Sequence, residues 1–454
     1  MKSSWRRLTR HLRSAAGRSS DWSLTSFGSP AAALLVMASF AISRVFLLAF
    51  HRHLSTDLNL YLLWLRRKAE GQVPYADFPI EYPPLAWWVI QLPGTTEALA
   101  YYARFRLLMG VADLAAFLLL GWLSYQRRAA AVLPAIAAYV GTTMLLEFVL
   151  YDRLDIVMAA LVLAALAAWI RAAASARAAV WRTIAYVAIA VGAAYKLIPI
   201  VVLPFMALSD LRTEGRWQPV AMRLGLCVLI LGAPIAATSR EAGLATLDFF
   251  GYHAARGIEV ESVWATVMWL ASAGDDSLHI VSRFGSWELA GASEAIVAKL
   301  AAWGMVGVFV TMTMWALALR GRFGIERAYL QALLLLPGLL VVSKVFSPQY
   351  LLWVLPLLML GAIELTGDRN RRRPLAVAVS CVILAGLTTA FYPLGRRYVD
   401  PLNGWIMALL AVRNVIYVGV VAWLFVLAFV RDFSTPAPGR VPVPAPTPTP
   451  LAGG

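Results

Sequence analysis

The chain has 454 residues, of which 60% are hydrophobic and 14% are charged, with a mean hydropathy of +0.70. Soluble domains carry about 45–50% apolar and about 25% charged residues, so the composition excludes a soluble globule, a disordered chain and a repeat solenoid. The net charge of +15 is explained by Lys and Arg in cytoplasmic loops, without nucleic acid as a partner. Continuous runs rich in Ala and Leu predict an all-α polytopic membrane protein and not a β-barrel.

The chain begins with a basic segment, residues 1–29, which we expect in the cytoplasm. The apolar run 30–50 lacks a small-residue cleavage site, so we interpret it as a retained first helix and not a signal peptide. Further runs are long enough to span a bilayer: 104–124, 130–149, 154–171, 219–237, 296–319, 375–393 and 404–430. The predicted transmembrane domain is 30–431, and the Pro-rich segment 432–454 is predicted to be a disordered cytoplasmic tail.

Two apolar runs are interrupted by short polar turns. Residues 182–208 are broken at Tyr195–Pro199, and residues 329–366 are broken at Ser343–Tyr350. Read as pairs of helices that cross out and back, they bring the total to about twelve crossings, or ten or eleven if a pair is re-entrant. Only this interpretation keeps every basic turn on one side of the membrane. These turns contain Arg127, Arg128, Arg171, Arg177, Arg182, Arg212, Arg216, Arg320, Arg322, Arg327, Arg369, Arg371, Arg372 and Arg373.

The loops expected on the outer side, 51–103 and 238–295, are balanced or acidic. This distribution predicts an integral protein of the bacterial plasma membrane with both termini in the cytoplasm.

The first outer loop concentrates carboxylates at the mouth of the predicted bundle. Asp57 follows the first helix, and Asp77, Glu81 and Tyr82 precede Pro83-Pro84, which forces an extended entry into the next apolar segment. The alternative is an ordinary solvated loop in which the acids balance Arg66, Arg67 and Lys68.

Two other outer turns carry charges among apolar residues. The short turn Tyr151–Asp155 contains Asp152, Arg153 and Asp155, which form either a local ion cluster or part of a site. In the long loop, His253 and Arg256 share a helix face and accompany Glu261. An arginine in such a place can hold an anionic oxygen.

Lys196 and Lys344 each lie at the turn of an interrupted pair. Such a lysine either extends to the interface or neutralises an anion there, and together with Arg256 the two indicate a lipid phosphate. A carboxylate near a phosphate leaving group suits sugar transfer from a polyprenyl phosphate, with the carboxylate as general base and the cations stabilising the leaving group. The chain has no Gly-rich phosphate loop for a nucleotide.

No metal or other cofactor is expected. The five His show no ligand spacing, and Cys227 and Cys381 lie inside apolar runs as buried small hydrophobes. Only Asp113 is plainly intramembrane, with Arg106 as a possible partner in the sequence.

Several stretches resemble glycosyltransferase family 87, polyprenyl-phosphate-mannose-dependent mannosyltransferases of the GT-C superfamily. They are Asp57-Leu-Asn-Leu-Tyr61, Gly71-x-x-Pro74-Tyr75-x-Asp77-Phe78-x-x-Glu81-Tyr82-Pro83-Pro84-Leu85, Tyr195-Lys196-x-x-Pro199, Tyr252-His253-x-x-Arg256-Gly257-Ile258-x-x-Glu261-Ser262 and Phe346-Ser347-Pro348-Gln349-Tyr350-Leu351-x-Trp353. The resemblance implies a GT-C-like bundle of about 10–12 helices with an outer-face catalytic cavity. It also implies inverting transfer without an essential metal, Asp57 as the base, and His253 and Arg256 near the sugar or phosphate. Many GT-C enzymes have two adjacent acids after the first helix, whereas residue 58 here is Leu.

The sequence thus predicts transfer of a hexose, with mannose implied by the resemblance, from a polyprenyl-phosphate sugar to a lipid-linked or envelope glycan acceptor, with membrane lipids around the enzyme. The predicted donor phosphate site comprises Lys196, His253, Arg256 and Lys344. The predicted sugar and acceptor pocket comprises Asp77, Glu81, Tyr82, Asp152, Arg153, Asp155, Glu261, Gln349 and Tyr350. The alternatives are a transporter or flippase of a lipid-linked saccharide, whose ionisable residues would lie near the bilayer midplane, and a non-catalytic subunit.

Overall fold

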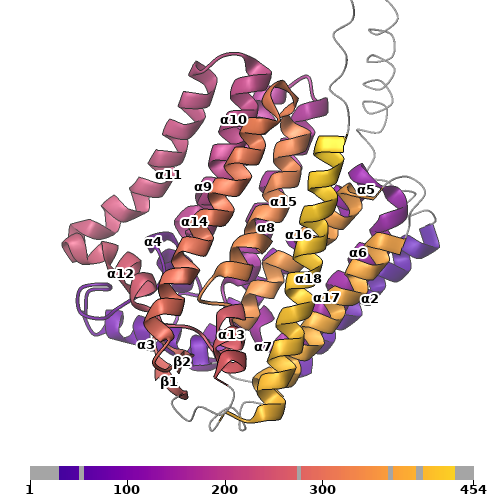
Figure 1. Cartoon of the computed structure of the whole chain (residues 1–454). Coiled ribbons are helices and arrows are strands. Elements are labelled where there is room, and N and C mark those ends of the chain that lie inside the picture. The colour runs from indigo at the N-terminus through magenta and orange to yellow at the C-terminus, as the bar shows by residue number, and fades with distance from the viewer. Residues whose placement is uncertain (1–29, 51–55, 273–277, 367–371, 395–401, 435–454) are drawn as a thin grey trace, which may run out of the picture.

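The computed structural model describes residues 30–50, 56–272, 278–366, 372–394 and 402–434, and within them the chain is a bundle of helices with one small hairpin (Figure 1). The predictions for residues 1–29 and for most of the Pro-rich tail lie outside these ranges. The helices of the first half are α2 (Pro30–Phe50), α3 (Thr56–Ala69), α4 (Pro84–Gln91), α5 (Ala98–Arg127), α6 (Val132–Leu145), α7 (Glu147–Leu150), α8 (Asp155–Ala174), α9 (Ala178–Tyr195) and α10 (Leu203–Glu214). The second half contains α11 (Gln218–Ala242), α12 (Asp248–Ala255), α13 (Val263–Ala271), β1 (His279–Arg283), β2 (Ser286–Ala290), α14 (Glu294–Ala318), α15 (Ile325–Val342), α16 (Leu351–Glu364), α17 (Arg372–Thr389) and α18 (Gly404–Ser434).

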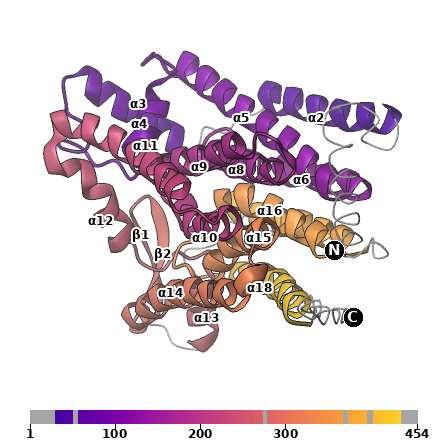
Figure 2. The same ribbon diagram turned by 90° about the horizontal axis from the view of Figure 1, so that it is seen from above.

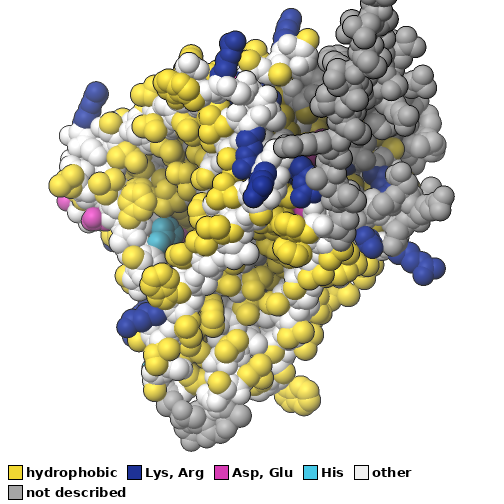
Figure 3. Space-filling view, turned by 45° about the horizontal axis from the view of Figure 1, so that its top comes forward, with side chains coloured by type: hydrophobic (Ala, Val, Ile, Leu, Met, Phe, Trp, Pro, Cys, Tyr) yellow, Lys and Arg dark blue, Asp and Glu magenta, His cyan; other side chains and the backbone are white. Residues whose placement is uncertain are grey.

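The predicted all-α membrane architecture is confirmed. Among the described residues, eight helical segments are long and apolar enough to cross a bilayer, namely α5, α8, α9, α11 together with its continuation to Ala255, α14, α15, α17 and α18. Three shorter apolar helices accompany them, at Leu34–Ala49, Ala129–Leu145 and Pro348–Glu364. The outer surface fits this assignment, because Figure 3 shows a face of the molecule covered largely by hydrophobic side chains, with a few Lys and Arg side chains in its upper half and at its edges. Trp303 on α14 and Met222 on α11 are examples, exposed by 72% and 76%.

Both interrupted runs are out-and-back pairs, as predicted. In the first pair, Arg182 near the start of α9 forms an ion pair with Glu214 at the end of α10. The second pair behaves in the same way, because Arg127 contacts both Glu326 at the start of α15 and Glu364 at the end of α16. Each pair therefore starts and ends at the same end of the bundle.

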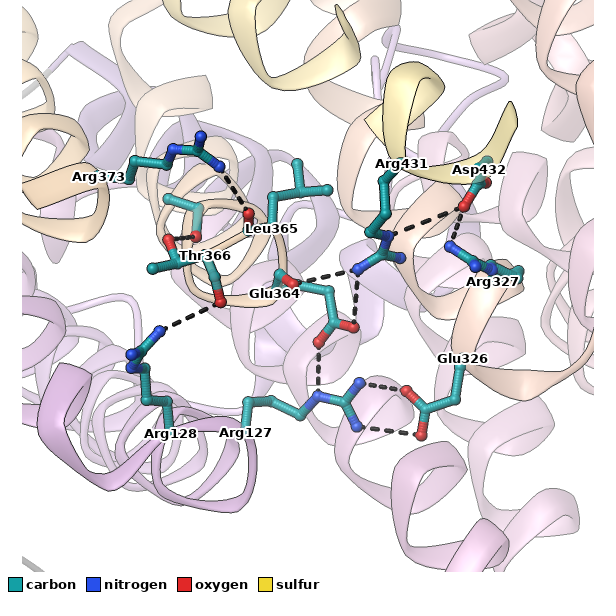
Figure 4. Close-up of polar contacts among 11 residues, drawn as sticks. Arg127, Arg128, Glu326, Arg327, Glu364, Leu365, Thr366, Arg373, Arg431 and Asp432 are labelled. Carbon is teal, nitrogen blue, oxygen red and sulfur yellow. Dashed lines mark hydrogen bonds and ion pairs between the residues drawn. The ribbon is translucent and has the colours of Figure 1, made fainter. Parts of the chain in front are cut away.

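An ion-pair network joins helix ends at the basic end of the bundle (Figure 4). Arg127 Nε lies 2.6 Å from Glu364, and Arg431 of α18 lies 3.5 Å from the same carboxylate. Asp432, which is 1% exposed, pairs with Arg327 and accepts a hydrogen bond from Trp315 Nε1 at 3.1 Å. These contacts place the basic turns after α5, before α15 and after α16 together, as the charge distribution predicts.

A second buried network lies between α2, α5 and α6, where Figure 2 shows α2 along the outside of the bundle. Arg44 of α2 donates to both carboxylate oxygens of Asp113 at 2.7 and 3.1 Å, and Asp113 also accepts from Tyr139 and Tyr151 at 2.7 and 2.8 Å. Asp113 thus pairs with Arg44 and not with Arg106. A buried charge that keeps a full set of partners is tolerated in the membrane.

The opposite end of the bundle is covered by short elements that lie across the helix ends (Figure 1). Pro83 has the extended conformation that the sequence predicts, with φ −58° and ψ 157°, and Pro84 begins α4. A proline suits the first helical position because its missing N–H has no partner there. The hairpin β1–β2 turns at Phe284 and Gly285, both with positive φ. These elements form the walls of the cavity described below.

Replacing Asp113 by Asn is expected to destabilise the protein by about 3–5 kcal/mol, because Arg44 then remains buried without a carboxylate. The measurement is thermal unfolding in detergent, which is monitored as loss of the monodisperse peak in size-exclusion chromatography. The double variant Arg44→Met/Asp113→Leu removes both charges and should recover most of the loss. Unfolding of Asp113→Asn at the wild-type temperature would contradict the importance of this pair.

Candidate active site

A cavity of about 670 Å³ opens at the end of the bundle opposite the basic network. Segments far apart in the sequence converge on it, from α3, the loop before α4, the turn before α8, the end of α12, the hairpin and the turn before α16. Seven of the predicted site residues line it: Asp57, Glu81, Tyr82, Arg153, Arg256, Glu261 and Gln349. The cavity therefore gathers half of the fourteen site residues that the sequence predicts.

Asp57 lies in the first turn of α3, where the helix N-terminus favours a negative charge. Its Oδ2 lies 2.7 Å from Arg153 Nε, and both side chains are largely shielded from solvent. The Arg153 guanidinium also donates to Gln349 Oε1 from the turn before α16. Arg153 thus connects the carboxylate of the first loop with the second interrupted pair.

The turn Tyr151–Asp155 does not form the local ion cluster that was one interpretation of its sequence. Asp152 pairs with Arg106 of α5 at 2.8 Å, Arg153 pairs with Asp57, and Asp155 pairs with Lys196 at 2.6 Å. Each charge therefore links the turn to a different element. Of the three residues, Arg153 alone lines the cavity.

Arg256 follows the last residue of α12 and lines the cavity. Its side chain is 8% exposed and lies 3.5 Å from Glu259, while its Nε has no hydrogen-bond partner among the described residues. A buried guanidinium with an unused donor at a cavity wall can bind an anionic oxygen.

Lys344 supports this segment from behind and does not line the cavity. Its Nζ donates to the carbonyl oxygens of Ala254, at 2.9 Å, and of Arg256. Burial, together with the neighbouring Arg256, lowers the pKa of Lys344. In this geometry Lys344 fixes the backbone that carries Arg256.

The other predicted residues lie near the cavity without lining it. Lys196 lies 5.1 Å from the ring centre of Tyr350, and its partner Asp155 also accepts from Trp353 Nε1 at 3.2 Å. His253 packs edge-on against Tyr252 at 5.8 Å. Asp77 accepts a hydrogen bond from the backbone N–H of Val73 and so closes its own loop.

Residues 258–260 run beside the hairpin and pair with it through one isolated antiparallel bridge, between Glu259 and Glu288. Leu289 N–H donates to the Ile258 carbonyl at 2.7 Å, and Val260 N–H donates to the Trp287 carbonyl at 2.9 Å. This segment brings Glu259 and Glu261 to the wall of the cavity. The Glu259 carboxylate accepts from Phe346 N–H at 2.7 Å and from Ser347 Oγ at 2.6 Å.

The hairpin wall is the part of the site that the sequence did not reveal. It contributes Ser282, Phe284, Gly285, Ser286 and Trp287, and Tyr392 from the end of α17 lies edge-on to Trp287 at 6.4 Å. The sequence signal was weak, because the two-residue turn consists of Phe-Gly and not of the usual Asn-Gly. Tyr252 holds the tip by donating to the Phe284 carbonyl at 2.6 Å.

Charged, polar and aromatic side chains make up much of the cavity lining. Within the described ranges, no group of three His, Cys, Asp or Glu side chains is placed to hold a metal. A shielded carboxylate beside two guanidinium groups, in a cavity with aromatic walls, can bind an anion and accept a proton from a bound hydroxyl group.

Replacing Tyr252 by Phe is expected to loosen the hairpin, because its tip loses a hydrogen bond worth about 1 kcal/mol. Amide exchange across 279–290 should accelerate by up to about tenfold, while exchange in the bundle helices stays unchanged. Hydrogen–deuterium exchange with mass spectrometry measures both. The control is Tyr125→Phe on α5. Equal amide exchange of the hairpin in both variants would show that the Tyr252 hydrogen bond does not hold the hairpin tip.

No protein-family model and no curated protein sequence matches the chain. Among solved structures, it is similar to ArnT from Cupriavidus metallidurans bound to undecaprenyl phosphate, with a TM-score of 0.41 and 18% identity over 87% of this chain and 78% of that one. It is similar to ArnT of the same organism in the apo state with a TM-score of 0.40 and 17% identity, over 88% and 78% of the two chains. Membership of glycosyltransferase family 87 therefore stays a prediction from the sequence motifs.

Proposed function

We propose that the protein is a membrane glycosyltransferase that moves a hexose from a polyprenyl-phosphate sugar to a lipid-linked or cell-envelope glycan acceptor. The reaction takes place at the outer face of the membrane and inverts the anomeric centre. Mannose is the donor sugar that the resemblance to family 87 implies, so polyprenyl-phosphate-mannose is the first donor to test.

The observation that carries the proposal is the cavity in which Asp57 lies 2.7 Å from Arg153 and shares the walls with Arg256. The acceptor hydroxyl attacks the anomeric carbon, and its proton passes to the Asp57 carboxylate. The bond between that carbon and the phosphate oxygen breaks with its electron pair on the phosphate. Arg256 and Arg153 stabilise the charge that grows there.

The other predicted residues take supporting roles in this proposal. Lys196 and His253 flank the phosphate site, and Lys344 positions Arg256 through its backbone carbonyl. The sugar and the acceptor are bound by the polar groups around Asp57. Of the predicted pocket residues, Glu81, Tyr82, Arg153, Glu261 and Gln349 line the cavity, while Asp77, Asp152, Asp155 and Tyr350 lie outside its lining.

The basic turns support the proposed side of the membrane. Arginines gather at the end opposite the cavity, and cytoplasmic loops are the ones enriched in Lys and Arg. With that end in the cytoplasm, the cavity faces outward and both chain termini are cytoplasmic. A donor attached to a lipid suits this side, because it reaches the cavity from the bilayer.

The alternative, a transporter of a lipid-linked saccharide, is less well supported. A transporter needs ionisable binding groups near the midplane and two alternating openings. The Arg44–Asp113 pair is engaged with Tyr139, Tyr151 and Thr143, and the basic end is closed by ion pairs (Figure 4). The charged groups of the cavity instead gather at one end, which favours an enzyme.

Replacing Asp57 by Asn is expected to lower kcat for mannose transfer by at least about 100-fold, because the amide cannot accept the proton. Binding of the donor should change much less. The assay is transfer from polyprenyl-phosphate-mannose by the purified protein into lipids of a deletion strain, read by mass spectrometry. The control is Asp248→Asn on the exposed surface of α12; near-wild-type turnover by Asp57→Asn would eliminate the role of base.

Replacing Arg256 by Gln or Lys344 by Ala is expected to raise the KM for the donor about tenfold or more with a smaller effect on kcat. Because Lys344 acts through the backbone of Arg256, the effects of the two changes should not add. Lys299→Ala, on the exposed surface of α14, serves as the control. An unchanged donor KM in both variants would reject the phosphate site.

A further inference from the structure

The charge of the cavity is unexpected for a site that binds an anion. Its lining contains four carboxyl groups, Asp57, Glu81, Glu259 and Glu261, and three guanidinium groups, Arg67, Arg153 and Arg256. With every one of these groups ionised, the lining has one more negative than positive charge, which disfavours a phosphate. Protonation of one carboxyl group would remove this excess.

The partners of the carboxyl groups indicate which one this is. Asp57 is paired with Arg153. Glu259 accepts hydrogen bonds from Phe346 N–H and Ser347 Oγ and forms an ion pair with Arg256 at 3.5 Å. Glu81 lies next to Tyr252 and His253. Only the Glu261 carboxyl has neither a hydrogen bond nor an ion pair among the described residues, although the side chain is just 6% exposed.

The position of Glu261 is fixed by α18. Asn414 Nδ2 donates to the backbone carbonyls of Glu261 and Ser262 at 3.3 and 3.1 Å and to Thr266 Oγ1 at 2.8 Å. These bonds hold the Glu261 backbone, while its carboxyl stays free at the cavity wall. The Glu261 carboxyl is therefore held in a fixed position and is available to bind a ligand.

Charged groups from every side act on this carboxyl. Burial and the neighbouring Glu259 raise the pKa of Glu261 to about 8, against the opposing effect of Arg413, Arg153 and Arg256. Arg413 of α18 is fully buried, stacks 4.0 Å over the Phe346 ring, and has no hydrogen-bond partner among the described residues for its guanidinium nitrogens. At neutral pH the carboxyl therefore keeps its proton and has an O–H group to donate.

We infer that Glu261 binds the phosphate group of the lipid donor, as a protonated carboxyl that donates a hydrogen bond to a phosphate oxygen held by Arg256. The inference rests on the proposed function, and within it moves Glu261 from the sugar and acceptor pocket to the donor phosphate site. It explains why a cavity with four acids accepts an anion. The proton stays on Glu261 throughout binding, and no bond is formed or broken.

The test is the pH dependence of undecaprenyl phosphate binding to the purified full-length protein in lipid nanodiscs. The wild type should lose about tenfold in affinity between about pH 7 and about pH 9, because ionised Glu261 repels the phosphate. The phosphate itself contributes little to this change, because its second pKa is about 6. Glu261→Gln, which keeps a neutral donor, should bind nearly as well as the wild type at pH 7 and lose the pH dependence.

Two further variants make the result decisive. Glu261→Ala lacks the hydrogen-bond donor and should bind undecaprenyl phosphate several-fold more weakly at pH 7. The control is Glu70→Gln, at an exposed residue after α3, which should bind like the wild type. A pH profile of Glu261→Gln that equals the wild-type profile would overturn the inference and assign the titration to another group, such as Lys344.

If the proposed function itself is wrong, the result differs: the wild-type protein does not bind undecaprenyl phosphate at any pH. Inorganic phosphate as a competitor separates the lipid from the free anion. If inorganic phosphate displaces undecaprenyl phosphate, with a pH dependence that Glu261→Gln removes, the site recognises the phosphate group by itself. If it does not displace the lipid, the site recognises phosphate only when it is attached to the lipid.

Discussion

A charged side chain in the hydrocarbon region costs free energy unless it has a partner, and this constraint shapes the bundle. Away from the bundle ends, Arg44 and Asp113 satisfy each other with the help of two tyrosines. At the basic end, Arg127, Glu326 and Glu364 connect the ends of three helices. At the opposite end, the cavity wall contains Arg256 and Glu261, which keep unused hydrogen-bonding capacity among the described residues.

These unused groups contrast with the buried Arg44–Asp113 pair. Among the described residues, Arg256 Nε has no partner and the Glu261 carboxyl is free, whereas the Asp113 carboxylate accepts from three side chains. Leaving buried polar groups unsatisfied costs stability unless a ligand completes them. The unused groups of the cavity wall are therefore available to a ligand.

Hydropathy and charge were sufficient to predict the bundle and both out-and-back pairs, since apolar length and the side preference of arginine are properties of local sequence. Hydropathy and charge could not predict which charged side chains form ion pairs with each other. Asp152, Arg153 and Asp155 are neighbours in the chain, yet each pairs with a different distant element. The hairpin wall with Trp287 was missed because its turn lacks the usual residues and its strands are short.

The Arg44–Asp113 pair also bears on how the chain enters the membrane. Arg44 belongs to α2, the first of the described helices, but its hydrogen-bond partners outside α2, Asp113 and Thr143, lie on α5 and α6. During synthesis α2 emerges before either partner exists, so its guanidinium must stay near water or be shielded by other means until α5 and α6 arrive. Stable burial of the first helix is consequently a late event of biogenesis, which depends on sequence made about a hundred residues later.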